Sequence, residues 1–79
     1  MYNLDMISVI REAVQKRLEE DGCVKAETLF KYVIIPKSKN FQTLDYRDMV
    51  RIMLMFIGEG WVVANVSSLQ ALDWEWCKK

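Results

Sequence analysis

The chain has 79 residues, 52% of them apolar and 28% charged, with one Pro and three Gly. This length fits one domain, residues 1–79, and the composition excludes a disordered tail, a collagen-like repeat and a low-complexity linker. The longest apolar run has six residues, Ile52 to Ile57, whereas a membrane-crossing helix needs roughly 20. The N-terminus carries neither a basic region nor an apolar segment. We therefore expect a cytoplasmic protein without membrane contact.

The charge of the chain is unevenly distributed. Eleven Lys and Arg balance eleven Asp and Glu, so the net charge is zero. Residues 31–51 are nevertheless basic, because they contain five Lys and Arg residues but only two acidic residues, Asp45 and Asp48. This pattern favours a local basic contact surface over wholesale coating of a nucleic acid.

Catalytic and metal chemistry find little support in the residues. The absence of His removes Ser-His and Cys-His nucleophile pairs and imidazole zinc ligands. No Gly-rich phosphate loop or pair of catalytic acids is present, and a domain this small has little room for a substrate pocket. We predict no enzyme, no small-molecule substrate, no cofactor and no metal site. Cys23 and Cys77 are expected to be two reduced, buried thiols, with a bridge between them as the alternative.

Residues 4–20 are predicted to form an amphipathic helix. Its apolar residues repeat at helical spacing: Ile7, Ile10, Val14 and Leu18. Gly22 supplies the left-handed residue that ends such a helix. Residues 23–24 then form a short extended piece, and residues 26–34 a second helix. Pro36 is expected to end that helix, because the residue before a proline is disfavoured in helical conformation.

Residues 36–42 are predicted to form a polar, basic turn that leads into a third helix, residues 44–57. Thr43 or Asp45 can cap this helix. Its apolar and charged side chains fall on opposite sides: Met49, Met53, Phe56 and Ile57 against Arg47, Asp48 and Arg51. We expect Met49 and Met53 to lie in the core.

The C-terminal part is predicted to be a β-hairpin. Gly58 and Gly60 end the third helix, and residues 61–66 form the first strand. Residues 67–70 connect it to a second strand, residues 71–77. That second strand alternates between apolar and acidic side chains: Leu72, Trp74 and Trp76 against Asp73 and Glu75. This period of two is typical of a half-buried antiparallel strand.

This order of elements resembles the winged helix-turn-helix superfamily over nearly the whole chain. Residues 55–63, MFIGEGWVV, are similar to the family's passage from the recognition helix into the first wing strand. Residues 24–29, VKAETL, are similar to its passage from the first strand into the second helix. The resemblance implies a small α+β fold of three helices, a short strand and a C-terminal hairpin, the wing. In such folds the short strand joins the hairpin, which would bring Cys23 near Cys77; we expect neighbouring thiols there.

The resemblance also implies binding of double-stranded DNA, with the third helix in the major groove. Arg47 and Arg51 lie one turn apart on this helix and would contact bases or phosphates. The backbone would be held by the preceding turn: Lys37, Lys39, Asn40 and Gln42. The simpler interpretation is that both Arg only form the solvated side of the helix. As a DNA reader the chain would be a dimeric transcriptional regulator, and its size suits a phage, virus or plasmid.

A second hypothesis is a protein-binding winged helix that acts as an inhibitor or adaptor of a larger complex. The predicted wing tip has no Lys or Arg, and its second strand carries Asp73 and Glu75. Leu54 and Met55 continue the charged stripe of the third helix and predict an exposed apolar patch. Such a patch would serve as a dimer interface or as the contact with a different protein.

Overall fold

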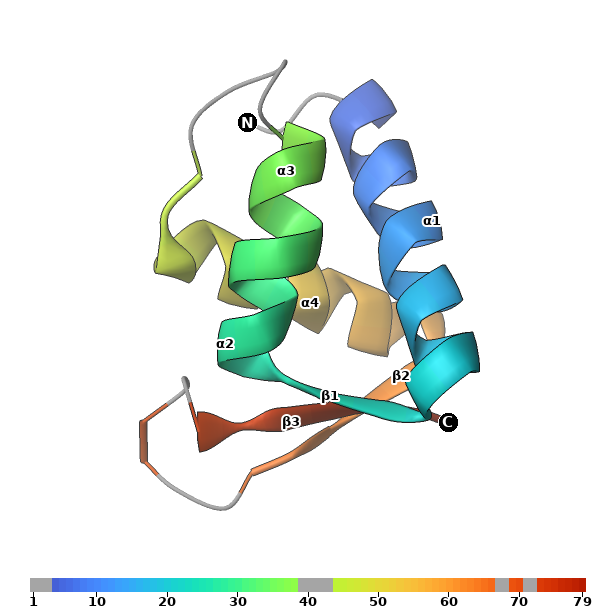
Figure 1. The fold of residues 1–79 in the computed structure, drawn as a ribbon, viewed down its shortest axis with the longest axis vertical. Coiled ribbons are helices and arrows are strands. Elements are labelled where there is room, and N and C mark those ends of the chain that lie inside the picture. Colours follow the sequence, from blue (N-terminus) through green and yellow to red (C-terminus); the bar gives the residue numbers. More distant parts are fainter. Residues whose placement is uncertain (1–3, 39–43, 67–68, 71–72) are drawn as a thin grey trace.

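The computed structural model describes residues 4–38, 44–66, 69–70 and 73–79. Over these residues the protein is a small α+β fold with three helices and a three-stranded antiparallel sheet (Figure 1). The elements in chain order are α1 (Leu4–Asp21), β1 (Cys23–Lys25), α2 (Ala26–Leu29), the π-helical turn η1 (Phe30–Ile34), α3 (Ile35–Ser38), α4 (Tyr46–Glu59), β2 (Val62–Asn65) and β3 (Glu75–Lys78). Because α2, η1 and α3 follow one another without a break, they form one continuous helix over residues 26–38.

The sheet joins the short strand that follows α1 to the two C-terminal strands. Its strand order is β1-β3-β2, so the short first strand lies beside the last strand, as expected from the hairpin arrangement. In this register Val24 faces Trp76, and Ala64 lies opposite Trp76 on the other neighbour. The helices all lie on one side of the sheet (Figure 1). Within the described ranges, no helix covers the opposite side.

The core lies between the helices and the covered side of the sheet. Trp76 from β3 and Phe56 from α4 are the largest fully buried side chains. α1 contributes the apolar positions that its spacing predicted: Ile7, Ile10, Val14 and Leu18. Met49 and Met53 are also fully buried, which confirms their predicted place in the core. A sheet of three short strands is stable here because three helices cover its apolar face.

The helix over residues 26–38 corrects the predicted end at residue 34. Pro36 is the second residue of α3 and does not end the helix. The Ile35 N–H donates to the carbonyl of Phe30, five residues earlier, so the change in hydrogen-bond register comes just before the proline. Pro36 has no N–H to donate, so the continuous helix lacks one backbone hydrogen bond at this position, and the wider π-helical turn directly before it accommodates the proline. Lys37 consequently lies in the helix and not in the predicted turn.

The boundaries of the later elements also differ from the predictions. α4 runs over Tyr46–Glu59, so Gly58 lies inside the helix, and only Gly60, with a φ of +90°, ends it. β2 is shorter than the predicted strand over residues 61–66. β3 begins at Glu75 and extends to Lys78, whereas the prediction placed the strand over residues 71–77. β3 is the central strand, so its pairing with β1 and β2 decides which residues are extended.

The two cysteines form a disulfide, which corrects the expectation of two reduced, buried thiols. Cys23 and Cys77 are direct partners in the β1–β3 register and are bonded to each other. Cys23 is exposed and Cys77 is half-buried, because both lie on the uncovered side of the sheet. The bridge closes a loop with a sequence separation of 54 and links β1 to the C-terminal strand.

No helix among the described residues is long and apolar enough to cross a membrane.

Candidate nucleic-acid interface

α4 has one buried and one exposed side, and the exposed side carries most of the predicted contact residues. Its buried side is fully covered by the core: Met49, Ile52, Met53 and Phe56. Its exposed side, here called the α4 outer face, consists of Arg47, Arg51, Leu54 and Met55. Their spacing of four, three and one residues places these side chains along one stripe of the helix. The same 3.6-residue period thus separates the core contacts of α4 from its free surface.

The first half of the α4 outer face is basic. Arg47 and Arg51 are both exposed, which confirms the predicted orientation of these side chains. On a helix, residues four apart have Cβ atoms about 5–6 Å from each other. Their two guanidinium groups can therefore reach neighbouring acceptors on one partner. Each offers several N–H donors in a planar fork, which matches phosphate oxygens or the two acceptors of a guanine edge.

The second half of the α4 outer face is apolar. The exposed fractions are 52% for Leu54 and 44% for Met55. The predicted exposed patch is therefore present. The outer face thus changes from cationic to apolar within two helical turns, and each half suits a different kind of contact.

A capping box fixes the start of α4. The Asp45 carboxylate accepts the Asp48 backbone N–H at 2.9 Å, and the Asp48 carboxylate accepts the Asp45 N–H at 3.0 Å. This confirms Asp45 as the capping residue. Because the Asp48 carboxylate turns back toward Asp45, it is engaged at the helix start beside Arg47. Two acidic groups at this position also interact favourably with the positive end of the helix dipole.

An aromatic contact holds the same end of α4 against the preceding helix. Tyr46 packs edge-to-face on Phe30 of η1, with ring centroids 5.3 Å apart and an interplanar angle of 84°. Burial, followed by the negative charges of Asp73 and Glu27, raises the pKa of Tyr46 to about 12. The phenol therefore stays neutral at physiological pH, and this end of α4 gains no negative charge from it.

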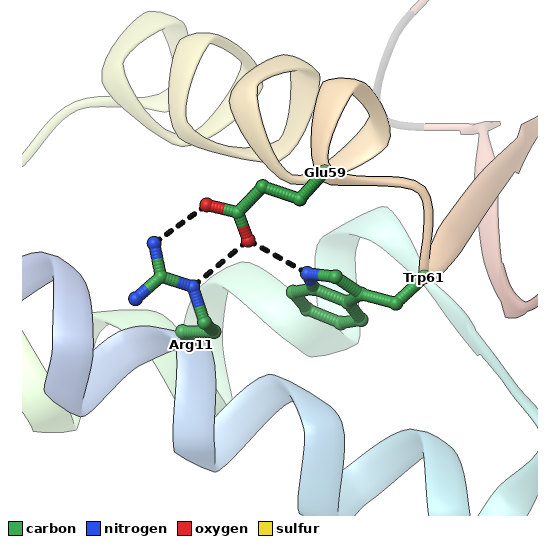
Figure 2. A network of polar contacts seen from close by, with 3 residues as sticks. All are labelled: Arg11, Glu59 and Trp61. Carbon is green, nitrogen blue, oxygen red and sulfur yellow. Dashed lines mark hydrogen bonds and ion pairs between the residues drawn. The ribbon is translucent and has the colours of Figure 1, made fainter.

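The other end of α4 is held by a polar network that sequence reasoning missed. The Glu59 carboxylate accepts two hydrogen bonds from Arg11 of α1, at 2.9 and 2.6 Å, and one from the Trp61 indole at 2.7 Å (Figure 2). The Arg11 guanidinium also lies 5.3 Å from the centre of the Phe56 ring. These contacts tie the end of α4 to α1 and to the chain entering β2.

Within this network, Arg11 and Glu59 each stabilise the charged form of the other. The hydrogen bond from Arg11, and then the one from Trp61, hold the pKa of the Glu59 carboxyl below its ordinary value of 4.5. The hydrogen bond to Glu59 in turn raises the pKa of Arg11. Only the short spacing of Glu59 and Trp61 is visible in the sequence. Arg11 is 48 positions from Glu59, so no local pattern could identify it as the partner.

Lys37 lies on a different surface from the α4 outer face. It is exposed and lines a shallow groove of about 660 Å³ between α1 and the helix over residues 26–38. The groove contains side chains of both charge signs, including Glu12 and Lys16, and the exposed Tyr32. The other predicted backbone contacts, Lys39, Asn40 and Gln42, lie outside the described residues. The structure therefore groups Arg47 with Arg51 but not Lys37 with either of them.

The predicted acidic wing residues belong to β3 and the turn before it. Asp73 is exposed, and Glu75 is half-buried at the first position of β3. In the register Glu75 faces Lys25 of β1 and Asn65 of β2. These acidic residues and the Leu54–Met55 patch are therefore on separate elements, and the structure does not place them on a common stripe.

Comparison with known proteins adds no relative: no family model matches the chain, and neither the curated proteins nor the solved structures searched contain a significant match.

Proposed function

We propose that the chain is a winged-helix protein that binds duplex DNA with the α4 outer face. The order of the elements supports this proposal, since a helix, a strand, two helices and a hairpin follow one another along the chain. The sheet order β1-β3-β2 supports it as well, because the short strand pairs with the last strand as the resemblance implies. α4 takes the position of the recognition helix in this assignment.

The observation that carries the proposal is the exposure of Arg47 and Arg51 one turn apart on the first half of α4. The major groove of B-DNA is about 12 Å wide and admits an α-helix with its side chains. A helix of 14 residues, about 21 Å long, can lie in that groove over several base pairs. In this position Arg47 and Arg51 bind guanine edges or phosphates.

The contacts at the two ends of α4 act as positioning elements. The capping box and the Phe30–Tyr46 packing hold the first turn of the helix, and the Arg11–Glu59–Trp61 network holds the last. A helix fixed in this way presents its outer face with little loss of conformational freedom on binding. Lys39, Asn40 and Gln42 remain proposed phosphate contacts, although they lie outside the described residues, whereas Lys37 lines the groove beside α1 and would contact phosphate apart from the α4 outer face.

The proposal extends to a dimeric regulator. One α4 outer face offers two Arg, which are few for selecting a single site in a genome. Helix-turn-helix proteins commonly solve this problem by binding two half-sites as a dimer. A dimer and a role in transcription, in a phage, virus or plasmid, therefore stay predictions that follow from DNA binding.

Fluorescence anisotropy with a labelled random duplex tests DNA binding. We expect micromolar or tighter affinity at about 50 mM salt and a loss of orders of magnitude at about 200 mM, because several phosphate contacts release counterions. The Arg47→Glu/Arg51→Glu variant should bind at least a hundredfold more weakly. The matched control is Lys16→Glu/Lys79→Glu, which makes the same change in net charge at exposed positions outside α4.

Circular dichroism of both variants confirms that they remain folded. The proposal fails if the wild type does not bind at the lower salt concentration. It also fails if both variants lose affinity equally, because general electrostatics and not the α4 outer face would then explain the binding.

The second candidate function is protein binding through Leu54 and Met55, whose exposure is high for apolar side chains. In this hypothesis the chain is an inhibitor or adaptor, with Asp73 and Glu75 as further contacts. The test compares capture of a partner by the wild type and by Leu54→Ser/Met55→Ser. Tyr32→Ser is the control, since Tyr32 is 71% exposed on another element. A partner lost only with the first variant, in a protein that does not bind DNA, supports this function.

A further inference from the structure

The uncovered side of the sheet gathers three residues with metal-binding atoms. Cys23 and Cys77 face each other across β1 and β3, and Glu75 lies two residues before Cys77 on the same side of β3. The two sulfur atoms and a carboxylate oxygen of Glu75 all lie within 4.8 Å of one another. Cys23 is exposed and the other two residues are half-buried, so solvent reaches the group.

We propose that these residues form a site for Zn²⁺ or a similar thiophilic divalent cation when the Cys23–Cys77 bridge is reduced. The disulfide and the metal exclude each other, because a sulfur atom in the bridge has no thiolate charge to donate. The protein therefore has two alternative cross-links between β1 and β3, one a disulfide bond and the other a bound metal ion.

The ligand chemistry suits zinc. Zn²⁺ in proteins takes thiolate sulfur at about 2.3 Å and carboxylate oxygen at about 2.0–2.2 Å, in tetrahedral geometry. These bond lengths place two sulfur ligands about 3.8 Å apart and a sulfur and an oxygen about 3.5 Å apart. In the bridged form the three donors lie within 4.8 Å of one another, with the two sulfurs bonded, so after reduction the site needs only side-chain rotations that move the sulfurs apart. A water molecule completes the fourth position, as in other sites with three protein ligands.

The scaffold and the local charge favour the same site. Two of the ligands stand on β3, the central strand, which is hydrogen-bonded on both sides. The third stands directly opposite on β1, so the backbone holds the donors in place without the metal. Two thiolates and a carboxylate carry three negative charges, one more than the two positive charges of the ion. Lys25, the register partner of Glu75, supplies a nearby positive charge.

The conversion of the disulfide form into the metal-bound form accounts for every electron and proton. A dithiol reductant gives two electrons and two protons to the bridge, the S–S bond breaks, and the reductant becomes a disulfide. The divalent cation then replaces the two thiol protons, which pass to solvent. The expectation of no metal site counted only Cys and His; the fold adds Glu75, which sequence analysis assigned to the wing surface. This site does not depend on DNA binding, since none of its ligands is on α4.

Cobalt titration of the full chain tests the site. The protein is reduced, freed of reductant under anaerobic conditions, checked by circular dichroism and titrated with Co²⁺. We expect one equivalent to produce a thiolate-to-cobalt charge-transfer band and the strong visible absorption of tetrahedral Co²⁺, and Zn²⁺ to abolish both. Glu75→Gln should weaken binding about tenfold or more. Glu20→Gln, the same change at an exposed α1 position, should leave binding unchanged.

The disulfide form provides the second arm, and it should show neither band. The proposal is overturned if the reduced chain gives no charge-transfer band, or if the disulfide form binds the ion equally well. It is also overturned if Glu75→Gln binds like Glu20→Gln. Loss of the folded circular dichroism spectrum on reduction alone would likewise overturn it, because the strands would no longer hold the three donors together.

Discussion

The α4 outer face and the uncovered side of the sheet are both exposed, but they are held in different ways. On the sheet, a covalent bond joins Cys23 to Cys77, and Glu75 stands beside it. On α4, Arg47 and Arg51 form no ion pair with another described residue, and Leu54 has half of its surface in solvent. One surface is cross-linked and the other is free.

This difference separates stability from binding. Substitutions on the cross-linked surface should change the free energy of unfolding, because they act on a long closed loop. Substitutions on the α4 outer face should change contacts with a partner and leave the fold intact. The two ends of α4 are intermediate, since each is tied to another element by a small number of contacts.

The largest effect is expected for Cys23→Ser/Cys77→Ser. The bridge closes a loop with a sequence separation of 54, and the chain-entropy model assigns such a closure about 4 kcal/mol. Urea unfolding should show this loss of stability relative to the oxidised wild type. The wild type kept in reductant without metal should match the variant. A difference below about 1 kcal/mol between oxidised and serine forms would contradict a stabilising role for the bridge.

A smaller effect is expected at the end of α4 for Glu59→Gln. The amide cannot pair with the Arg11 charge, and a partly exposed, bidentate pair of this kind contributes about 1 kcal/mol. The pKa of Glu59 is lower in the folded protein, so this stabilisation is present above about pH 4.5 and is lost as the pH falls through the folded pKa. The variant should therefore lose part of the acid sensitivity of the wild type.

The control for this prediction is Glu12→Gln, which makes the same change at an exposed position of α1. Thermal unfolding followed from pH 3 to pH 7 distinguishes the two variants. Equal behaviour of Glu59→Gln and Glu12→Gln would mean that the network does not hold α4.

At the start of α4, ionisation of the Tyr46 phenol should affect stability only in strong base. Its pKa is raised to about 12 in the folded protein from an ordinary 10.0. The stabilisation is complete below about pH 10 and is lost as the pH rises toward 12. Tyr46→Phe should remove this part of the alkaline loss of stability, measured as the difference between the two proteins in urea. An ordinary tyrosinate titration at position 46 would contradict its burial against Phe30.

The smallest effect on stability is expected for Arg47→Ala/Arg51→Ala. Both side chains are exposed, and such surface changes stay within about 0.5 kcal/mol. Lys16→Ala, another exposed helix position, is the reference. A loss above about 1 kcal/mol would show that the α4 outer face contributes to the fold, and the comparison between the two surfaces would then no longer hold.

Local patterns predicted the class of each element correctly but not the lengths of most of them. The helical period of α1, the Asp45 cap and the two left-handed glycines follow from interactions within a few residues of each other. Pro36 misled the prediction, because the π-helical turn before it changes the hydrogen-bond register and lets the helix continue. Gly58 misled it similarly, since packing of the neighbouring Phe56 and Ile57 keeps the helix intact past that glycine.

The candidate interface was partly predictable, because the helical period of α4 is also a local pattern. The exposure of Arg47, Arg51, Leu54 and Met55 follows from their position relative to the apolar stripe of one helix. The place of Lys37 does not, because it depends on how α1 packs against the helix over residues 26–38.

The sequence by itself determined the α+β class, the buried side of each long helix and the free surface of α4, since periodicity and capping act over a few residues. Only the tertiary structure decided that Cys23 bonds to Cys77, that Arg11 holds Glu59, and that Glu75 joins the cysteine pair. Arg11 and Glu59 are far apart in the chain and meet where α1 lies beside the end of α4, whereas the pairing of β1 with β3 brings Cys23 to Cys77 and Glu75. The pairing of strands and the packing of helices set such distances, and no local pattern encodes them.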